Sequence, residues 1–246
     1  MNLVAQTKTG LRRVANRDKA KILARFFKTG KGEYGEGDKF LGVVVPEQRK
    51  IAKHFAQGLS LVSLQKLLQS PWHEERLVAL LILVELYRSS TGLDQVKQKQ
   101  IFNFYLENIS QINNWDLVDL SAPNIVGDYL FNYYSNKKEV KKFLLELAQS
   151  KNVWSRRVAV LATFIFIKNK QFAYSLELTR FLLFKQKEKH DLIHKALGWM
   201  LREIGKRDQK VLEKFLNKHI VQLPRVTFRY AIERFTDAKR SIYLKR

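Results

Sequence analysis

The sequence predicts an all-α fold, and three observations lead to this prediction. Apolar residues recur three and four positions apart in one segment after another, and no stretch alternates like a strand over more than four residues. The breaks between segments contain glycine, proline or a polar cap such as Ser60. Finally, apolar runs that follow a basic residue recur along the chain, at Arg76, Arg157, Lys195 and Arg229.

The predicted helices are separated by glycine, proline and capping signals. Residues 1–17 look like an N-terminal arm, and helical periodicity begins near Arg17. Five glycines between residues 30 and 42 predict a surface loop, because that glycine density cannot hold a helix. Ser70-Pro71 predicts a helix over 72–88, with serine as its cap and proline at its first position. Further helices are expected at about 17–27, 46–57, 60–70, 94–109, 115–134 with a break at Pro123, 137–149, 152–168, 171–185, 188–205, 207–218 and 224–236.

The recurring basic and apolar runs indicate a helical repeat. They start 81, 38 and 34 residues apart, and the first interval divides into two of about 40. A helix pair per unit at this spacing is typical of HEAT-like repeats. We therefore expect residues 1–246 to form a single α-solenoid domain, with the glycine-rich loop at 30–42. The inner helices of such a solenoid would line one concave, basic face.

The charge balance points to a polyanionic partner. The chain has 45 Lys and Arg against 23 Asp and Glu, a net charge of +22. Residues 151–246 carry 23 basic and 8 acidic side chains, and so 15 of these 22 excess charges. Nucleic acid is the partner best suited to this excess. A membrane surface and a basic protein without such a partner remain the alternatives.

Several site classes are excluded or disfavoured. The chain has no cysteine, which rules out disulfides, thiolate metal sites and cysteine nucleophiles. His190 and His194 lie four residues apart without an obvious third ligand, so we expect no metal and no cofactor. The most apolar run, residues 77–87, is about half as long as a membrane-spanning helix. We therefore expect no membrane-spanning helix and, with nucleic acid as the preferred partner, no membrane.

One segment combines residues that could do chemistry. Trp115 and Asp119 are four residues apart, so the indole and the carboxylate project from the same side of a helix. Arg157 follows about one repeat later and could lie on the neighbouring inner helix, with Trp199 on the same face. The competing interpretation is structural, since stacked repeats are often tied together by pairs of Asp and Arg.

These residues belong to motifs that resemble a known family. Residues 115–119, Trp-Asp-Leu-Val-Asp, with Gly127-Asp128 downstream, resemble the W-D-x-V-D and G-D elements of the AlkD-type DNA alkylation repair glycosylases. Residues 152–157 look like the N-x-W-x-x-R segment of that family, and residues 195–203 are similar to its K-A-x-G-W-x-L-R-E helix. The loop ending in Lys39-Phe40-Leu41-Gly42 also looks like many members. The matches keep their order between about residues 20 and 205.

The resemblance implies an enzyme of base excision repair. Its members are HEAT-like solenoids that hydrolyse the N-glycosidic bond of cationic N3- or N7-alkylated purines in duplex DNA. Asp119 matches the catalytic carboxylate, Trp115 and Trp199 the aromatic residues beside the lesion, and Arg157 the arginine at the site. Phe26 matches a position that is often Tyr in that family, so a role that needs the hydroxyl does not carry over to this chain, whereas stacking or packing does.

The expected partner is duplex DNA with alkylated bases, bound by a monomer in the cytoplasm of a bacterial-type cell, at the nucleoid. Candidates for contacts to the DNA backbone are Arg156, Lys168, Lys195, Arg202 and Arg229. Each could instead belong to a solvated charged surface. A non-catalytic nucleic-acid-binding solenoid and an adaptor for acidic protein segments remain alternatives to the glycosylase.

Overall fold

The fold is all-α, as the sequence predicts. The computed structural model describes residues 2–92, 94–134 and 136–245. Over these residues the regular structure is helical, apart from an isolated parallel bridge between Lys39 and Trp72. The chain divides into two compact units, residues 1–121 and 122–246. A single solenoid domain with a concave basic face stays a prediction.

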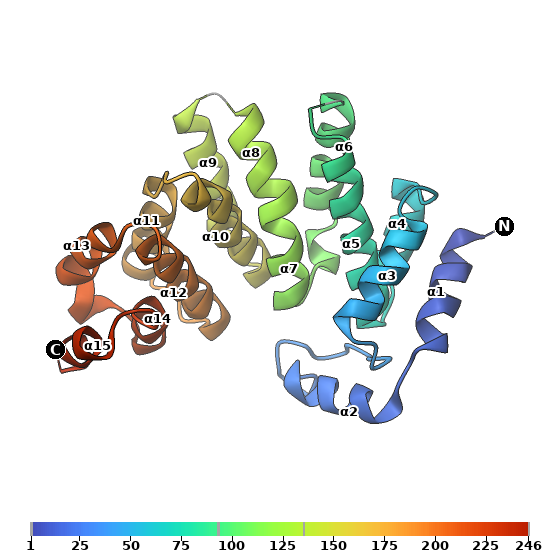
Figure 1. The fold of residues 1–246 in the computed structure, drawn as a ribbon, viewed down its shortest axis with the longest axis horizontal. Helices are drawn as coiled ribbons and strands as arrows, with labels where there is room; N and C mark the ends of the chain where they lie inside the picture. Colours follow the sequence, from blue (N-terminus) through green and yellow to red (C-terminus); the bar gives the residue numbers. More distant parts are fainter. Residues whose placement is uncertain (1, 93, 135, 246) are drawn as a thin grey trace. The chain divides into compact units, whose positions relative to one another are not determined.

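The first unit is built around α5, which α1, α3, α4 and α6 all contact (Figure 1). Residues 73–84 of α5 are buried without a break, so this helix is covered on every side. The helices of the unit are α1 Leu3–Arg13, α2 Arg17–Phe26, α3 Val45–Phe55, α4 Leu61–Leu68, α5 His73–Ser89, α6 Gln95–Glu107, the short 3-10 helix η1 Ile109–Gln111, and α7 Trp115–Ala122, which ends one residue into the second unit.

The N-terminal arm is wrong as a prediction, because residues 3–13 form α1. The Asn2 side chain caps this helix by accepting a hydrogen bond from the Ala5 amide. Thr7 and Leu11 are fully buried where α1 packs on α3, α4 and α5. Only a few apolar residues mark the inner face of α1, so the helical period was too weak to recognise.

The start of α5 also differs from the prediction. Ser70 and Pro71 lie outside the helix, which begins at His73. The Pro71 carbonyl accepts a hydrogen bond from the Lys39 amide at 3.0 Å, and the His73 amide donates to the Lys39 carbonyl at 2.8 Å. Pairing with the glycine-rich loop therefore keeps residues 70–72 extended and delays the helix by one residue relative to the predicted 72.

The second unit is organised around α10 and α12, which contact each other. The α10 helix also contacts η2, α9 and α11, while α12 contacts α13 and α14 (Figure 1). The break expected at Pro123 is a single π-helical turn that begins at this proline. The helices are η2 Pro123–Gly127, α8 Asp128–Tyr133, α9 Lys137–Ala148, α10 Val153–Lys168, α11 Ala173–Arg180, the π-helical η3 Phe181–Lys185, α12 Asp191–Gly205, α13 Gln209–His219, the 3-10 helix η4 Ile220–Gln222, α14 Arg225–Ala231 and α15 Asp237–Leu244.

Within the part of the chain that the structure describes, none of the helices combines the length and the apolar character that a bilayer crossing requires.

Candidate functional site

The helix that carries the candidate catalytic residues begins at a well-defined cap. Asn114 is fully buried, and its side-chain oxygen accepts a hydrogen bond from the Trp115 amide at 2.8 Å. Its side-chain nitrogen donates to the Asp38 carboxylate at 3.1 Å. Asp116 lies in the first turn, where the positive end of the helix dipole favours a carboxylate. The position of Trp115 is therefore tied to the glycine-rich loop.

The Trp115 indole lies in an aromatic cluster. Its ring stacks on Phe27, with the ring centroids 5.2 Å apart and 21° between the planes. Phe26 meets the indole edge to face, with a centroid distance of 5.8 Å. Phe27 is buried, whereas Phe26 is 61% exposed and Trp115 is half-buried. Two of the predicted site residues, Phe26 and Trp115, thus present aromatic surface side by side.

A buried histidine lies behind this cluster. The rings of His73, Phe27 and Phe40 are mutual neighbours, with centroids 4.7 to 5.1 Å apart. The imidazole Nε2 lies 2.8 Å from the Asp116 carboxylate, and Nδ1 lies 3.3 Å from Asp38. The imidazole therefore joins the glycine-rich loop to the first turn of α7.

The two carboxylates decide the charge of His73. Burial would lower the pKa of the imidazole, but the charge and hydrogen bond of Asp116, with the hydrogen bond of Asp38, raise it to about 9. Burial would raise the pKa of Asp38, yet its hydrogen bond with His73 and the charge of Arg76 hold it below the usual value. At neutral pH the cluster holds two cations and two anions.

Asp119 lies one helical turn after Trp115, and its carboxylate is half-buried. Its charge reaches Tyr105 on α6. Burial and the charge of Asp119 raise the pKa of that phenol, against the hydrogen bond with Ser121, whose Oγ lies 2.9 Å away. An uncharged phenol therefore lies near the candidate catalytic carboxylate.

The second unit holds Arg157 and Trp199 on neighbouring helices. Arg157 on α10 is buried, and its guanidinium donates a hydrogen bond to the Leu192 carbonyl at the start of α12. Trp199 on α12 is half-buried, with its ring centroid 6.1 Å from that of Phe164. The Lys168 ammonium lies over the same Phe164 ring, at 5.0 Å from its centroid. Asp119 belongs to the first unit, so its gathering with Arg157 and Trp199 stays a prediction.

The other predicted backbone-contacting residues differ in their surroundings. Arg156 is paired with Glu188 at 2.5 Å and donates to the carbonyls of residues 150 and 151. Lys195 pairs with Asp191 at 2.6 Å. Arg202 pairs with Glu233, and Arg229 is exposed. A phosphate could therefore contact Arg229 directly. At Arg156, Lys195 and Arg202 it would have to displace the paired carboxylate or share the cation with it.

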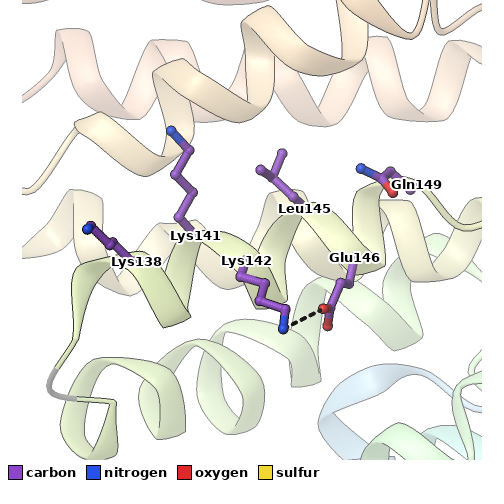
Figure 2. Close-up of a pocket in the computed structure, with 6 residues that line it drawn as sticks. All are labelled: Lys138, Lys141, Lys142, Leu145, Glu146 and Gln149. Carbon is purple, nitrogen blue, oxygen red and sulfur yellow. Dashed lines mark ion pairs between the residues drawn. The ribbon is translucent and has the colours of Figure 1, made fainter.

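A shallow pocket with basic side chains lies on the surface of this unit. Three lysines, Lys138, Lys141 and Lys142, line a shallow pocket on α9 (Figure 2). Two of them are ion-paired, with Glu177 and Glu146, and the pocket contains none of the predicted site residues. Among residues 2–92, 94–134 and 136–245, no three histidine or acidic side chains are grouped as metal ligands.

The buried residues behind Trp115 are not among those predicted from the sequence. His73 belongs to none of the motifs described above, and Asp38 falls in the stretch predicted only as a surface loop. The available signal was the charged run His73-Glu74-Glu75-Arg76 directly before the apolar run 77–84, because charges that enter a core need partners. The partner Asp38 is 35 residues away, and no local pattern identifies it.

Comparisons with known proteins agree with this architecture. A family model described as "DNA alkylation repair enzyme" matches residues 7–235. A predicted DNA alkylation repair enzyme from Enterococcus faecalis is similar in structure, with a TM-score of 0.67 and 16% sequence identity. That match covers 91% of this chain and 97% of the other. No curated protein matches the sequence. The chain belongs to the DNA alkylation repair enzyme family.

Proposed function

We propose that this protein is an alkylpurine DNA glycosylase that hydrolyses the N-glycosidic bond of cationic N3- or N7-alkylated purines in duplex DNA. The observation that carries the proposal is on α7. This helix places a half-buried carboxylate, Asp119, one turn from the Trp115 indole, which is fixed by a side-chain cap and a stacked ring. Membership of the DNA alkylation repair enzyme family supports it.

The chemistry explains how one carboxylate can be sufficient. The bond between C1′ and the purine nitrogen breaks, and the base keeps the electron pair. Positive charge grows on the sugar in the oxocarbenium-like transition state. Asp119 stabilises this charge and accepts a hydrogen bond from the water that forms the new bond to C1′, and the extra proton of that water is released to the solvent. An alkylated purine is already cationic, so it leaves as a neutral base without a second acid to protonate it.

The aromatic residues fit the charge of the lesion. Trp115 is half-buried and Phe26 is largely exposed, so both can offer ring surface to a cationic base or to the sugar. A cation over an indole face gains about 0.5 to 2 kcal/mol. Phe26 lacks a hydroxyl, so its contribution is contact and not hydrogen bonding. Trp199 is a further candidate for such a contact.

The test measures base release and DNA binding separately. Purified protein is incubated with methylated duplex, and released purine is quantified by chromatography. We expect release by the wild type and a loss of at least about 100-fold in Asp119→Asn, the range seen when an electrostatic stabiliser is removed. Binding to undamaged duplex should be retained. Glu107→Gln removes an exposed carboxylate from α6 and should leave release unchanged.

Three outcomes would contradict the proposal. If the wild type releases no base from several lesion types but binds DNA with a steep salt dependence, the protein is a non-catalytic nucleic-acid-binding solenoid. A flat salt response would favour an adaptor for acidic protein segments. If Asp119→Asn unfolds more easily and releases base normally, the Asp has a structural role, such as a pair with Arg.

A further inference from the structure

Five polar side chains form a buried cluster behind Trp115, which we call the His73 network. It joins three segments that are far apart in the chain, namely the glycine-rich loop, α5 and α7. His73 is 2% exposed and Asn114 is fully buried. Its members are Asp38, His73, Arg76, Asn114 and Asp116.

The two aspartates of the network differ in how much they depend on His73. Asp38 has three partners, since Arg76 donates to it at 2.6 Å and Asn114 at 3.1 Å, while the His73 Nδ1 lies 3.3 Å away. Asp116 has a side-chain partner in His73 and also accepts from the Leu117 amide. Removal of His73 therefore leaves Asp38 held on two sides but releases Asp116 from α5.

Two routes connect the imidazole to the Trp115 indole. The first is covalent, because Asp116 directly follows Trp115 in the first turn of α7. The second is through ring contacts, because Phe27 packs on His73 at 4.9 Å and stacks on Trp115 at 5.2 Å. The imidazole therefore contacts both elements that position the indole, namely the first turn of α7 through Asp116 and the Phe27 ring.

The charge of the network requires a cation at position 73. Asp38 and Asp116 are two carboxylates, and Arg76 balances only one of them. A neutral residue at 73 would leave a partly buried anion without a countercharge, which is costly in a protein interior. The two aspartates favour the imidazolium in agreement with this count.

We propose that His73 is a positioning residue for the reaction, which fixes the Trp115 indole by tying α7 to α5 and to the glycine-rich loop. This inference rests on the proposed glycosylase function, because Trp115 and Asp119 share α7. His73 is only 2% exposed, so it acts through Trp115 and not by contact with DNA. A displacement of about 1 Å at a reacting group can lower a rate about 100-fold.

The first experiment reads the indole directly and does not require activity. The protein is labelled with 5-fluorotryptophan, which gives one fluorine resonance for each of its four tryptophans. Trp115→Phe identifies the Trp115 signal. His73→Phe keeps a ring between Phe27 and Phe40 but removes both polar contacts. We expect it to shift and broaden the Trp115 signal, while those of Trp154 and Trp199 stay in place.

A matched control separates positioning from general loosening. Glu75 is fully buried on the same helix, two residues after His73, and pairs with Lys8 and Arg12 of α1 at 2.9 and 3.0 Å. Glu75→Gln removes from the same helix a buried charge whose two partners are on α1 and are partly exposed. It should leave the Trp115 signal unchanged. An unchanged Trp115 signal in folded His73→Phe, or an equal shift in Glu75→Gln, would overturn the proposal.

The second experiment measures the reaction. In single-turnover assays on methylated duplex, we expect His73→Phe to lower the rate by about 10-fold to 100-fold at unchanged affinity for DNA. His73→Gln keeps one hydrogen-bond donor and should recover part of the rate. If His73→Phe does not fold, His73→Gln takes its place in both experiments. A normal rate in a variant whose Trp115 signal has moved would refute the positioning role. If the wild type itself is inactive, the glycosylase proposal fails, and the fluorine signals still decide whether His73 fixes Trp115.

Discussion

The His73 Nε2 lies 2.8 Å from the Asp116 carboxylate, and this contact joins the first turn of α5 to the first turn of α7. Both residues are the first or second of their helices, so each helix start is held by the other. Since α7 carries Trp115 and Asp119, the proposed chemistry depends on a buried pair that does not touch DNA.

Stability should fall as pH rises from about 6.5 to above 9. The folded-state pKa of His73 is about 9 against 6.5 for the ordinary group. The imidazolium therefore contributes stability fully below pH 6.5, and this is lost as pH rises through 9. The difference corresponds to about 3 kcal/mol as an order of magnitude. Urea unfolding at a series of pH values measures it.

The His73→Gln variant is the control for this pH effect. Asp38, Asp116 and Arg76 face the imidazole and are present in both proteins, so the difference in stability between the two isolates the contribution of His73. The variant should be less stable than the wild type near neutral pH, and the gap should narrow above pH 9. A gap that stays constant with pH would show that His73 is neutral when folded.

Gly42→Ala should destabilise the protein by at least about 3 kcal/mol. Gly42 has a φ of +80°, and an added Cβ would lie 2.0 Å from the Asn16 carbonyl oxygen. Gly32 has the same φ of +80° with no neighbour within 4 Å of an added Cβ. Gly32→Ala should therefore cost only the conformational penalty, about 1 kcal/mol.

Thermal or urea unfolding of the two glycine variants compares them directly. The difference between them measures the close approach of the loop to the start of α2. Equal destabilisation would show that the loop can move away from Asn16 at little cost.

Phe26→Ala and Phe27→Ala should separate function from stability. Phe26 is 61% exposed and lies edge-on to Trp115, so its loss should reduce base release with a change of less than about 0.5 kcal/mol in unfolding free energy. Phe27 is 7% exposed and contacts Phe40, His73 and Trp115. Its truncation should cost about 3 to 5 kcal/mol.

Phe26→Tyr provides a second comparison at the same position. It adds the hydroxyl that the family resemblance implies at this position, on a ring that is already exposed. Base-release assays with single-turnover kinetics show whether the hydroxyl changes the rate. Unaltered release by Phe26→Ala would exclude Phe26 from the lesion contact.

The fold was largely predictable because local signals mark most of its helices. Ser60 caps the helix that follows it, as the sequence predicts, and Asp94 and Asn114 likewise accept hydrogen bonds from amides at the starts of α6 and α7. The start of α5 was misplaced because Pro71 pairs with Lys39, a contact across more than 30 residues. Propensity describes neighbours in the chain, whereas this start is set by a distant loop.

In the candidate site, too, the local features were predictable and the contacts between distant residues were not. Spacing placed Trp115 and Asp119 on one helix, and the structure agrees with their one-turn separation. The contact between Phe26 and Trp115 joins the end of α2 to the start of α7, and the family resemblance pointed to both residues without predicting this contact. Asp38 and His73 could not be predicted as site residues, because their importance depends on hydrogen bonds to each other and to Asp116. These contacts join residues that are far apart in the sequence and exist only in the folded chain.

Glu74, the neighbour of His73, shows a further property of the glycine-rich loop. Its buried carboxylate accepts hydrogen bonds from three successive amides, those of Leu41 at 2.9 Å, Gly42 at 2.8 Å and Val43 at 3.2 Å. Consecutive amides around an oxyanion form the kind of concavity in which proteins bind phosphate. Here the anion is an intramolecular ligand, attached to α5 and present at a high effective concentration. The loop therefore keeps its shape without an exchangeable ion, and neither dilution nor dialysis can remove what holds it.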